Sequence, residues 1–199
     1  MSEPSAETQP TADATWSDRK VVVAVAGGIA CYKTASMVSR LIQHGAAVRV
    51  VMTEAATRFV TPLTFQALSG RSVLTSVWQS DDQPDSQHIG VARWCELMVI
   101  APATADVIGR LAAGLCHDVV TLVATALPRS TPLLLAPAMN SDMWENPIVQ
   151  RNVATVKEVL GGHVVGPEEG WQACRTLGMG RMSEPEAIIA AAAKLLPPR

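Results

Sequence analysis

Three polar side chains in this 199-residue sequence have types and surroundings that suit catalysis: His88, Asn140 and Cys174. A histidine exchanges a proton near neutral pH, an asparagine amide can hold a carboxylate without adding charge, and a thiol on a glycine-rich flap can deliver a proton once the flap closes. Arg175 and Arg181 can stabilise that thiolate or bind a substrate phosphate. Taken singly, the three have equally good structural roles: a surface cap, a turn residue and a bystander thiol.

A pair of glycines, Gly27-Gly28, lies between an apolar run and a helical pattern, an arrangement that suits a phosphate. Glycines let backbone amides approach the anion, and a helix N-terminus favours its charge. Because the fingerprint GxGxxG is absent, the pair favours a mononucleotide over NAD, with a plain strand-to-helix turn as the alternative. Thr53 and the turn Ala103–Asp106 follow other predicted strands, where a hydroxyl or carboxylate can cap a helix or bind a cofactor.

Charge and cysteine usage limit the classes of function. The net charge is −2 with no run of Lys or Arg, which argues against nucleic-acid or anionic-membrane binding. No stretch approaches the ~20 apolar residues of a membrane span. The four cysteines lie far apart without zinc-site spacing. No metal site is therefore predicted, and His117 beside Cys116 is interpreted as a lone neighbour rather than a site.

The segments that must position these residues alternate between strands and helices. Apolar periodicity predicts strands at Val21–Ala26, Ala47–Met52, Leu97–Ala101, Pro132–Ala136 and Val164–Val165, and helices at Ile29–His44, Glu54–Phe59, Pro62–Leu68, Ala103–Ala113, Val119–Ala126, Pro147–Leu160 and Ser183–Leu196. This alternation predicts an α/β fold with one parallel, doubly wound sheet. Ligands bind such sheets beyond the carboxyl ends of the strands, where most of the residues above fall.

Three segments do not fit the alternation. Residues 1–19, rich in Ser, Thr, Pro and acidic residues, are predicted to form a disordered tail, and Ser80–Gln87 a loop. The glycine-rich segment Gly166–Arg181 is too long for an ordinary connection and is predicted to be a functional flap. Ser183, followed three residues later by Glu186, predicts a capping box at the start of the last helix.

The order and spacing of these motifs carry more information than any one of them. Gly27-Gly28, His88, the Pro102–Asp106 turn, the Pro137–Trp144 segment and Cys174 together resemble the homo-oligomeric flavin-containing cysteine decarboxylases, over about residues 20–196. The most specific part is Pro-Ala-Met-Asn-Ser-Asp-Met-Trp, which fits the family pattern Pro-x-Met-Asn-x-x-Met-Trp. The Pro102–Asp106 turn departs from the family form Pro-Ala-Ser-Ala-Asn-Thr.

The resemblance implies a flavodoxin-like (Rossmann-like) three-layer sandwich over residues 20–199, acting in the cytoplasm. It implies a homo-oligomer, a trimer or a multiple of trimers, with FMN at the subunit boundary. Carried over by position, the FMN contacts are Gly27, Gly28, Ile29, Thr53, Ala103, Thr104, Ala105, Asp106 and Met139. Whether the chain is a stand-alone enzyme or part of a fusion stays open.

The resemblance also implies a reaction. A small molecule, 4′-phosphopantothenoylcysteine, is oxidised by the flavin to a thioaldehyde, loses carbon dioxide and is re-reduced to 4′-phosphopantetheine in coenzyme A biosynthesis. His88 is then the base or positioning group, Cys174 the proton donor, and the substrate contacts are Asn140, Met143, Arg175 and Arg181. The alternatives are a decarboxylase of a peptide C-terminal cysteine and a non-catalytic flavin-binding regulatory protein of the same family.

Overall fold

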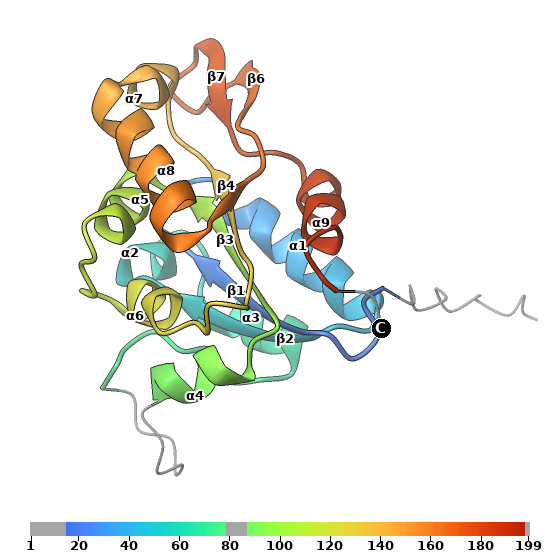
Figure 1. Cartoon of the computed structure of the whole chain (residues 1–199). Coiled ribbons are helices and arrows are strands. Elements are labelled where there is room, and N and C mark those ends of the chain that lie inside the picture. Colours follow the sequence, from blue (N-terminus) through green and yellow to red (C-terminus); the bar gives the residue numbers. More distant parts are fainter. Residues whose placement is uncertain (1–14, 79–86, 198–199) are drawn as a thin grey trace, which may run out of the picture.

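The fold is built on one parallel sheet, seen in a computed structural model that describes residues 15–78 and 87–197 (Figure 1). The strands are β1 (Lys20–Val25), β2 (Ala47–Met52), β3 (Leu97–Ala103), β4 (Leu133–Pro137) and β5 (His163–Val164), in the order β2-β1-β3-β4-β5. Val23 pairs with Val50 on one side and Val99 on the other. This is the flavodoxin-like order of a doubly wound sheet, so the predicted fold class is confirmed.

Each face of the sheet carries its own apolar core, which makes the fold a three-layer sandwich. One core packs α1 (Cys31–Gln43), α3 (Pro62–Ser69) and α9 (Pro185–Ala193) against the sheet. The other packs α4 (Gln87–Trp94), α5 (Ala105–Ala112), α6 (Val119–Thr125) and α8 (Pro147–Leu160). The apolar run of β1 serves both cores, because successive residues of a strand point to opposite faces: Val23 into the first and Val22 into the second.

Short helices and a hairpin complete the carboxyl edge of the sheet. The helices are α2 (Glu54–Thr57) and α7 (Ser141–Glu145), and the second of these has no counterpart in the sequence prediction. The predicted flap is an antiparallel hairpin, β6 (Glu168–Trp171) and β7 (Leu177–Arg181), which lies beside α7 and above β4 in the view of Figure 1.

Several predicted boundaries are wrong, for local reasons. Helix α1 begins at Cys31 rather than Ile29, because the residues before it form a turn in which Cys31 N–H donates to the Gly28 carbonyl. Strand β3 continues to Ala103 through a cis Ala101–Pro102 bond, so α5 begins at Ala105.

The predicted capping box at the last helix is also wrong. The N-cap of α9 is Glu184, whose side chain makes no capping hydrogen bond, and Pro185 occupies the first turn. Ser183 is buried at 2% exposure against the Gly166 turn and is unavailable as a cap.

The last five residues of the predicted disordered tail, 15–19, are part of the folded domain. Residues 1–14 lie outside the described part of the chain, but residues 15–19 pack on the domain: Trp16 is 1% exposed and Arg19 is 5% exposed. Residues 80–86 of the predicted loop also lie outside the described residues, and Gln87 begins α4. Within the described ranges, no helix has the length and apolar character needed to cross a membrane.

Candidate active site

A cavity of about 1550 Å³ opens at the carboxyl ends of the strands. Residues from the first turns of α1, α2, α5, α6 and α7 all line it. Ligand pockets in proteins are typically ~300–1,000 Å³, so this space is large enough for a cofactor and a substrate together. Because the N-terminus of a helix carries partial positive charge and free backbone N–H groups, the cavity favours a ligand with anionic groups.

The glycine turn after β1 forms one wall of the cavity. A Cβ added to Gly27 would lie 2.4 Å from Ala55 Cβ, so only glycine allows β1 to approach the start of α2 this closely. A Cβ on Gly28 would make an ordinary van der Waals contact with Thr104 Cγ2, at 3.6 Å, and Gly28 itself lines the cavity. Thr53 caps α2 by accepting Ala56 N–H at 3.2 Å, which leaves its hydroxyl hydrogen free to donate into the cavity.

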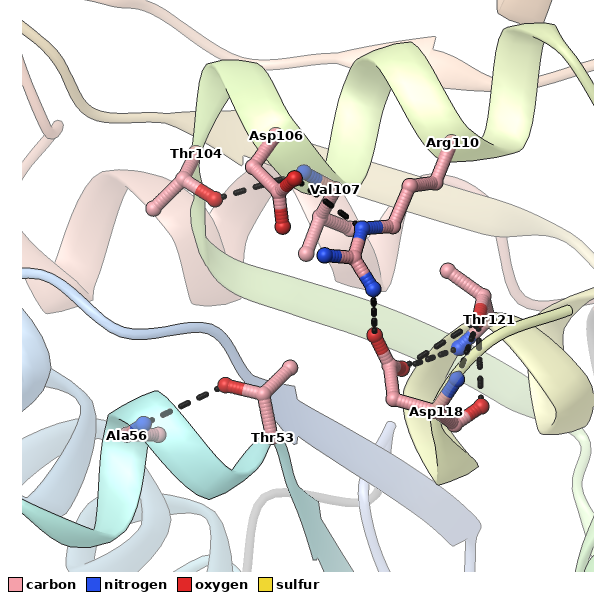
Figure 2. Close-up of polar contacts among 8 residues, drawn as sticks. All are labelled: Thr53, Ala56, Thr104, Asp106, Val107, Arg110, Asp118 and Thr121. Carbon is pink, nitrogen blue, oxygen red and sulfur yellow. Dashed lines mark hydrogen bonds and ion pairs between the residues drawn. The ribbon is translucent and has the colours of Figure 1, made fainter. Parts of the chain in front are cut away.

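A charged cluster forms the wall beside Thr104 (Figure 2). Thr104 caps α5 by accepting Val107 N–H at 3.4 Å. Arg110 lies between two carboxylates: its Nε is 2.9 Å from Asp106 Oδ1 and its Nη1 is 3.3 Å from Asp118 Oδ2. Asp118 in turn caps α6. The cluster therefore leaves one net negative charge on this wall and joins the starts of two helices.

Arg110 and Asp118 were missed in the sequence prediction, although the spacing of four between Asp106 and Arg110 is a usable signal. Of the predicted FMN contacts, Ala103 does not line the cavity, because it is fully buried in β3. Ile29, Ala105 and Met139 do line it.

Asn140 occupies the turn between β4 and α7 and also lines the cavity. Its Oδ1 accepts Met143 N–H at 2.9 Å and its Nδ2 donates to Asp142 Oδ2 at 3.3 Å, so it is the N-cap of α7. An amide nitrogen carries two hydrogens, and one remains for a ligand. Asn140 and Met143 both line the cavity, so the turn role and the binding role are compatible.

The tip of the hairpin brings a thiol to the same cavity. Cys174 Sγ lies 2.9 Å from Thr176 Oγ1 and 3.5 Å from Gln172 Oε1, and Cys174 lines the cavity together with Arg175. Arg175 adopts a left-handed backbone conformation with φ of 66°, which is uncommon for a non-glycine residue and is found at functional turns.

The other cysteines are not placed for this chemistry. Cys31 and Cys95 are buried, and burial raises the pKa of both thiols, that of Cys95 to about 12. Cys116 is exposed but does not line the cavity. Among the described residues, Cys174 is therefore the cysteine that lines the cavity.

Most basic side chains at the cavity are already paired with carboxylates. Lys33 Nζ lies 2.9 Å from Glu184 Oε1, and Arg181 Nη2 lies 3.3 Å from the same oxygen and 3.5 Å from Glu168 Oε2. The hydrogen bond from Lys33, together with the charge of Arg181, lowers the pKa of the Glu184 carboxyl. Among the described residues, Arg175 forms no ion pair and is the more available cation for an anionic substrate.

His88 does not line the cavity of its own chain. It is half-buried in the first turn of α4, a helix that packs against α6 and that Figure 1 draws at the far end of the molecule from the hairpin. His117, interpreted above as no site, does line the cavity beside Asp118. The structure therefore brings Asn140 and Cys174 together but not His88. In the described part of the chain, no cluster of His, Cys, Asp or Glu suits a metal.

The strand order, the glycine turn and the anion-favouring cavity define an α/β protein of the flavodoxin-like class, with a thiol-bearing hairpin over the cofactor end of the sheet. Residues 11–196 match the family model described as Flavoprotein, and the chain belongs to this family. It is 45% identical over 177 residues to the coenzyme A biosynthesis bifunctional protein CoaBC of Bacillus subtilis, a match that covers 89% of this chain and 43% of the relative. The chain thus spans less than half the length of that relative.

This chain matches two solved structures over nearly the whole length of each. A PPC decarboxylase cysteine-to-serine mutant, complexed with pantothenoylaminoethenethiol, superposes with a TM-score of 0.77 at 30% identity, covering 87% of this chain and 96% of that one. The FMN binding protein AtHal3 superposes with a TM-score of 0.74 at 30% identity, covering 87% and 94%. Both share the flavodoxin-like fold described above.

Proposed function

We propose that the chain catalyses the FMN-dependent decarboxylation of 4′-phosphopantothenoylcysteine to 4′-phosphopantetheine in coenzyme A biosynthesis. The observation that carries the proposal is one cavity that joins the Gly27-Gly28 turn to Asn140 and Cys174. The similarity to CoaBC and to PPC decarboxylase supports the same reaction.

The residues at the cavity fit FMN. The backbone of Gly28 at the cavity wall, the hydroxyl of Thr53 and the converging helix N-termini suit a phosphate, and the cavity has room for a ring system and a substrate. When bound, FMN supplies a two-electron acceptor that takes electrons from the substrate cysteine and returns them after carbon dioxide has left. The net reaction replaces a carboxylate by a proton and needs no external oxidant.

The chain's own residues bind and protonate the substrate. The free Nδ2 hydrogen of Asn140 holds the carboxylate that leaves, and Met143 packs against the cysteine moiety at the cavity wall. Arg175 binds the substrate phosphate, in preference to Arg181, whose guanidinium is engaged by two carboxylates. Cys174, on the hairpin tip, donates the proton that completes the product.

His88 acts in this proposal on a neighbouring copy, because it does not reach the cavity of its own chain. A homotrimer, or a multiple of trimers, supplies such a copy. Exposed apolar side chains on the described surface support an oligomer: Leu63 is 70% exposed, Ile148 59% and Trp171 63%. The reaction requires a reduced Cys174, which fits the reducing conditions of the cytoplasm.

The direct test is to purify the protein, record a flavin spectrum and supply 4′-phosphopantothenoylcysteine, with 4′-phosphopantetheine detected by mass. The dephosphorylated substrate and a peptide with a C-terminal cysteine serve as matched comparisons, and we expect the phosphorylated substrate to be preferred because of Arg175. A flavin-containing protein that decarboxylates only the peptide would support the peptide alternative, and one that leaves all three unchanged would support the regulatory alternative.

A further inference from the structure

One buried side chain links the hairpin to the turn that carries Asn140, and neither the sequence pattern nor the proposed mechanism uses it. Gln172 follows β6 directly and is only 7% exposed, although glutamine is usually a surface residue. Its carboxamide lies at the point where three segments meet: the hairpin tip, strand β7 and the start of α7.

Each polar atom of the carboxamide has a partner from a different segment. Oε1 accepts Ser141 N–H at 3.2 Å and lies 3.5 Å from Cys174 Sγ, while Nε2 donates to the Met179 carbonyl at 3.1 Å. Ser141 immediately follows Asn140 and is the first residue of α7, so its N–H has no partner within the helix. A single side chain therefore satisfies this N–H and also contacts the thiol.

The surrounding backbone is shaped to admit this carboxamide. A Cβ on Gly180 would lie 3.1 Å from Gln172 Nε2, and a Cβ on Gly178 would lie 2.9 Å from the Ser141 side chain. The backbone of Gln172 also closes the turn that carries Cys174: its N–H donates to the Thr176 carbonyl at 2.9 Å and its carbonyl accepts Arg175 N–H at 2.9 Å. Gln172 is thus fixed at both its main chain and its side chain.

We propose that Gln172 is a positioning residue, whose buried carboxamide fixes the Cys174 thiol relative to the Asn140 amide. The proposal rests on the proposed function, because those two groups are assigned there to the proton and to the carboxylate. Without the carboxamide, the hairpin and the α7 turn move independently, and the thiol no longer faces the carbon from which carbon dioxide has left.

The experiment compares the wild-type holoenzyme with Gln172→Met, which keeps the side-chain length and removes the hydrogen bonds. Hydrogen exchange measured on peptides is expected to accelerate together in residues 168–181 and 139–145, while α8 stays unchanged. In turnover, the fraction of substrate released as the unreduced enethiol is expected to rise at least about tenfold, since each lost hydrogen bond favours the misaligned state severalfold. Gln43→Met is the matched control, because Gln43 is exposed and its side chain donates to Ser39 Oγ of the same helix.

Gln172→Glu provides a second variant that tests the same bonds. A protonated carboxyl can accept from Ser141 N–H and donate to the Met179 carbonyl, whereas the carboxylate cannot donate. As the pH falls, the Gln172→Glu variant is therefore expected to regain the exchange protection that wild type shows in the hairpin and the α7 turn at the same pH.

Faster exchange confined to the hairpin, with an unchanged enethiol fraction, would overturn the proposal and leave Gln172 a local structural residue. If neither wild type nor any variant decarboxylates the substrate, the proposed function fails. Hydrogen exchange in the two segments still tests whether Gln172 couples the hairpin to the α7 turn.

Discussion

Gly180 and Met139 lie so close that a Cβ added to Gly180 would be 2.2 Å from the Met139 carbonyl oxygen. The approach is fixed by a hydrogen bond of 3.0 Å from Met139 N–H to the Gly180 carbonyl. Because Met139 precedes Asn140 and Gly180 lies in β7, this contact holds the hairpin against the turn that carries the amide. It is the backbone part of the connection that brings Asn140 and Cys174 to one cavity.

Replacing Gly180 by alanine should break this contact. Gly180 has φ of 143°, a conformation that costs an L-residue ~1–3 kcal/mol, and the added Cβ would also force the hairpin away from Met139. We expect Gly180→Ala to lower the unfolding temperature and to reduce decarboxylation at least about tenfold. Gly70→Ala is the control, because Gly70 has φ of 66° with nothing within 4 Å. Equal losses of activity in the two variants would contradict a role for the contact itself.

Long, strongly patterned segments could be predicted from the sequence with correct bounds. Strand β2 is apolar at every position except Arg49, and α8 lies between Pro147 and Gly161, whose φ of 66° ends the helix. Helix α7 has only five residues, too few for apolar periodicity to appear. The extension of β3 beyond Ala101 could not be predicted either, because it depends on the pairing of Ala103 with Pro137 of β4.

The candidate site was predictable only where a local motif marks it. The Gly27-Gly28 turn, Asn140 and Cys174 fall at strand ends or on a glycine-rich segment, and the structure places all of them at the cavity. The ion pair between Lys33 and Glu184 joins residues 151 positions apart, and the sequence carries no local signal for it. Gln172 likewise acquires its partners only when the hairpin folds onto α7.

The charged cluster in Figure 2 predicts an effect on cofactor affinity. Arg110→Met leaves the carboxylates of Asp106 and Asp118 on the cavity wall without their cation, so an anionic ligand is repelled. We expect the dissociation constant of FMN, measured by flavin fluorescence, to rise about tenfold, with a smaller rise at high salt because screening weakens the repulsion.

Arg58→Met is the matched control for that measurement. Arg58 also lines the cavity and pairs with Glu54, but both side chains of this pair are largely exposed, at 78% and 88%. Solvent screens such a pair, so its loss should change FMN affinity little. An Arg110 variant that binds FMN as wild type does at low salt would show that the charge of this wall does not act on the cofactor.

The pairing of Glu184 with Lys33 predicts a pH-dependent contribution to stability. The pKa of Glu184 is lowered in the folded protein from an ordinary value of 4.5, so the unfolded chain binds the proton more readily. The stabilisation is therefore fully present above pH 4.5 and is lost as the pH falls through the folded-state pKa. Glu184→Gln should be less stable than wild type at pH 7, and the two unfolding temperatures should converge at acid pH.

Glu54→Gln is the comparison for that titration, because both side chains of the Glu54–Arg58 pair are largely exposed and solvent screens such a pair. A gap between wild type and Glu184→Gln that stays constant from pH 7 to acid pH would mean that the variant acts through packing rather than through the charge of Glu184.

The separation of His88 from Cys174 in one chain predicts complementation between inactive variants. Cys174→Ser should permit oxidation and decarboxylation but release the enethiol, and His88→Asn should block the first step. If each site combines His88 of one copy with Cys174 of another, co-expression of the two variants creates some sites with both native residues. Mixed oligomers should then form 4′-phosphopantetheine, detected by mass, although neither variant alone does so.

The control is wild type co-expressed with a double variant that carries both His88→Asn and Cys174→Ser. It gives the yield of product expected when native and inactive copies mix at random. If the mixed single variants stay inactive while this control keeps its activity, His88 does not serve a neighbouring copy.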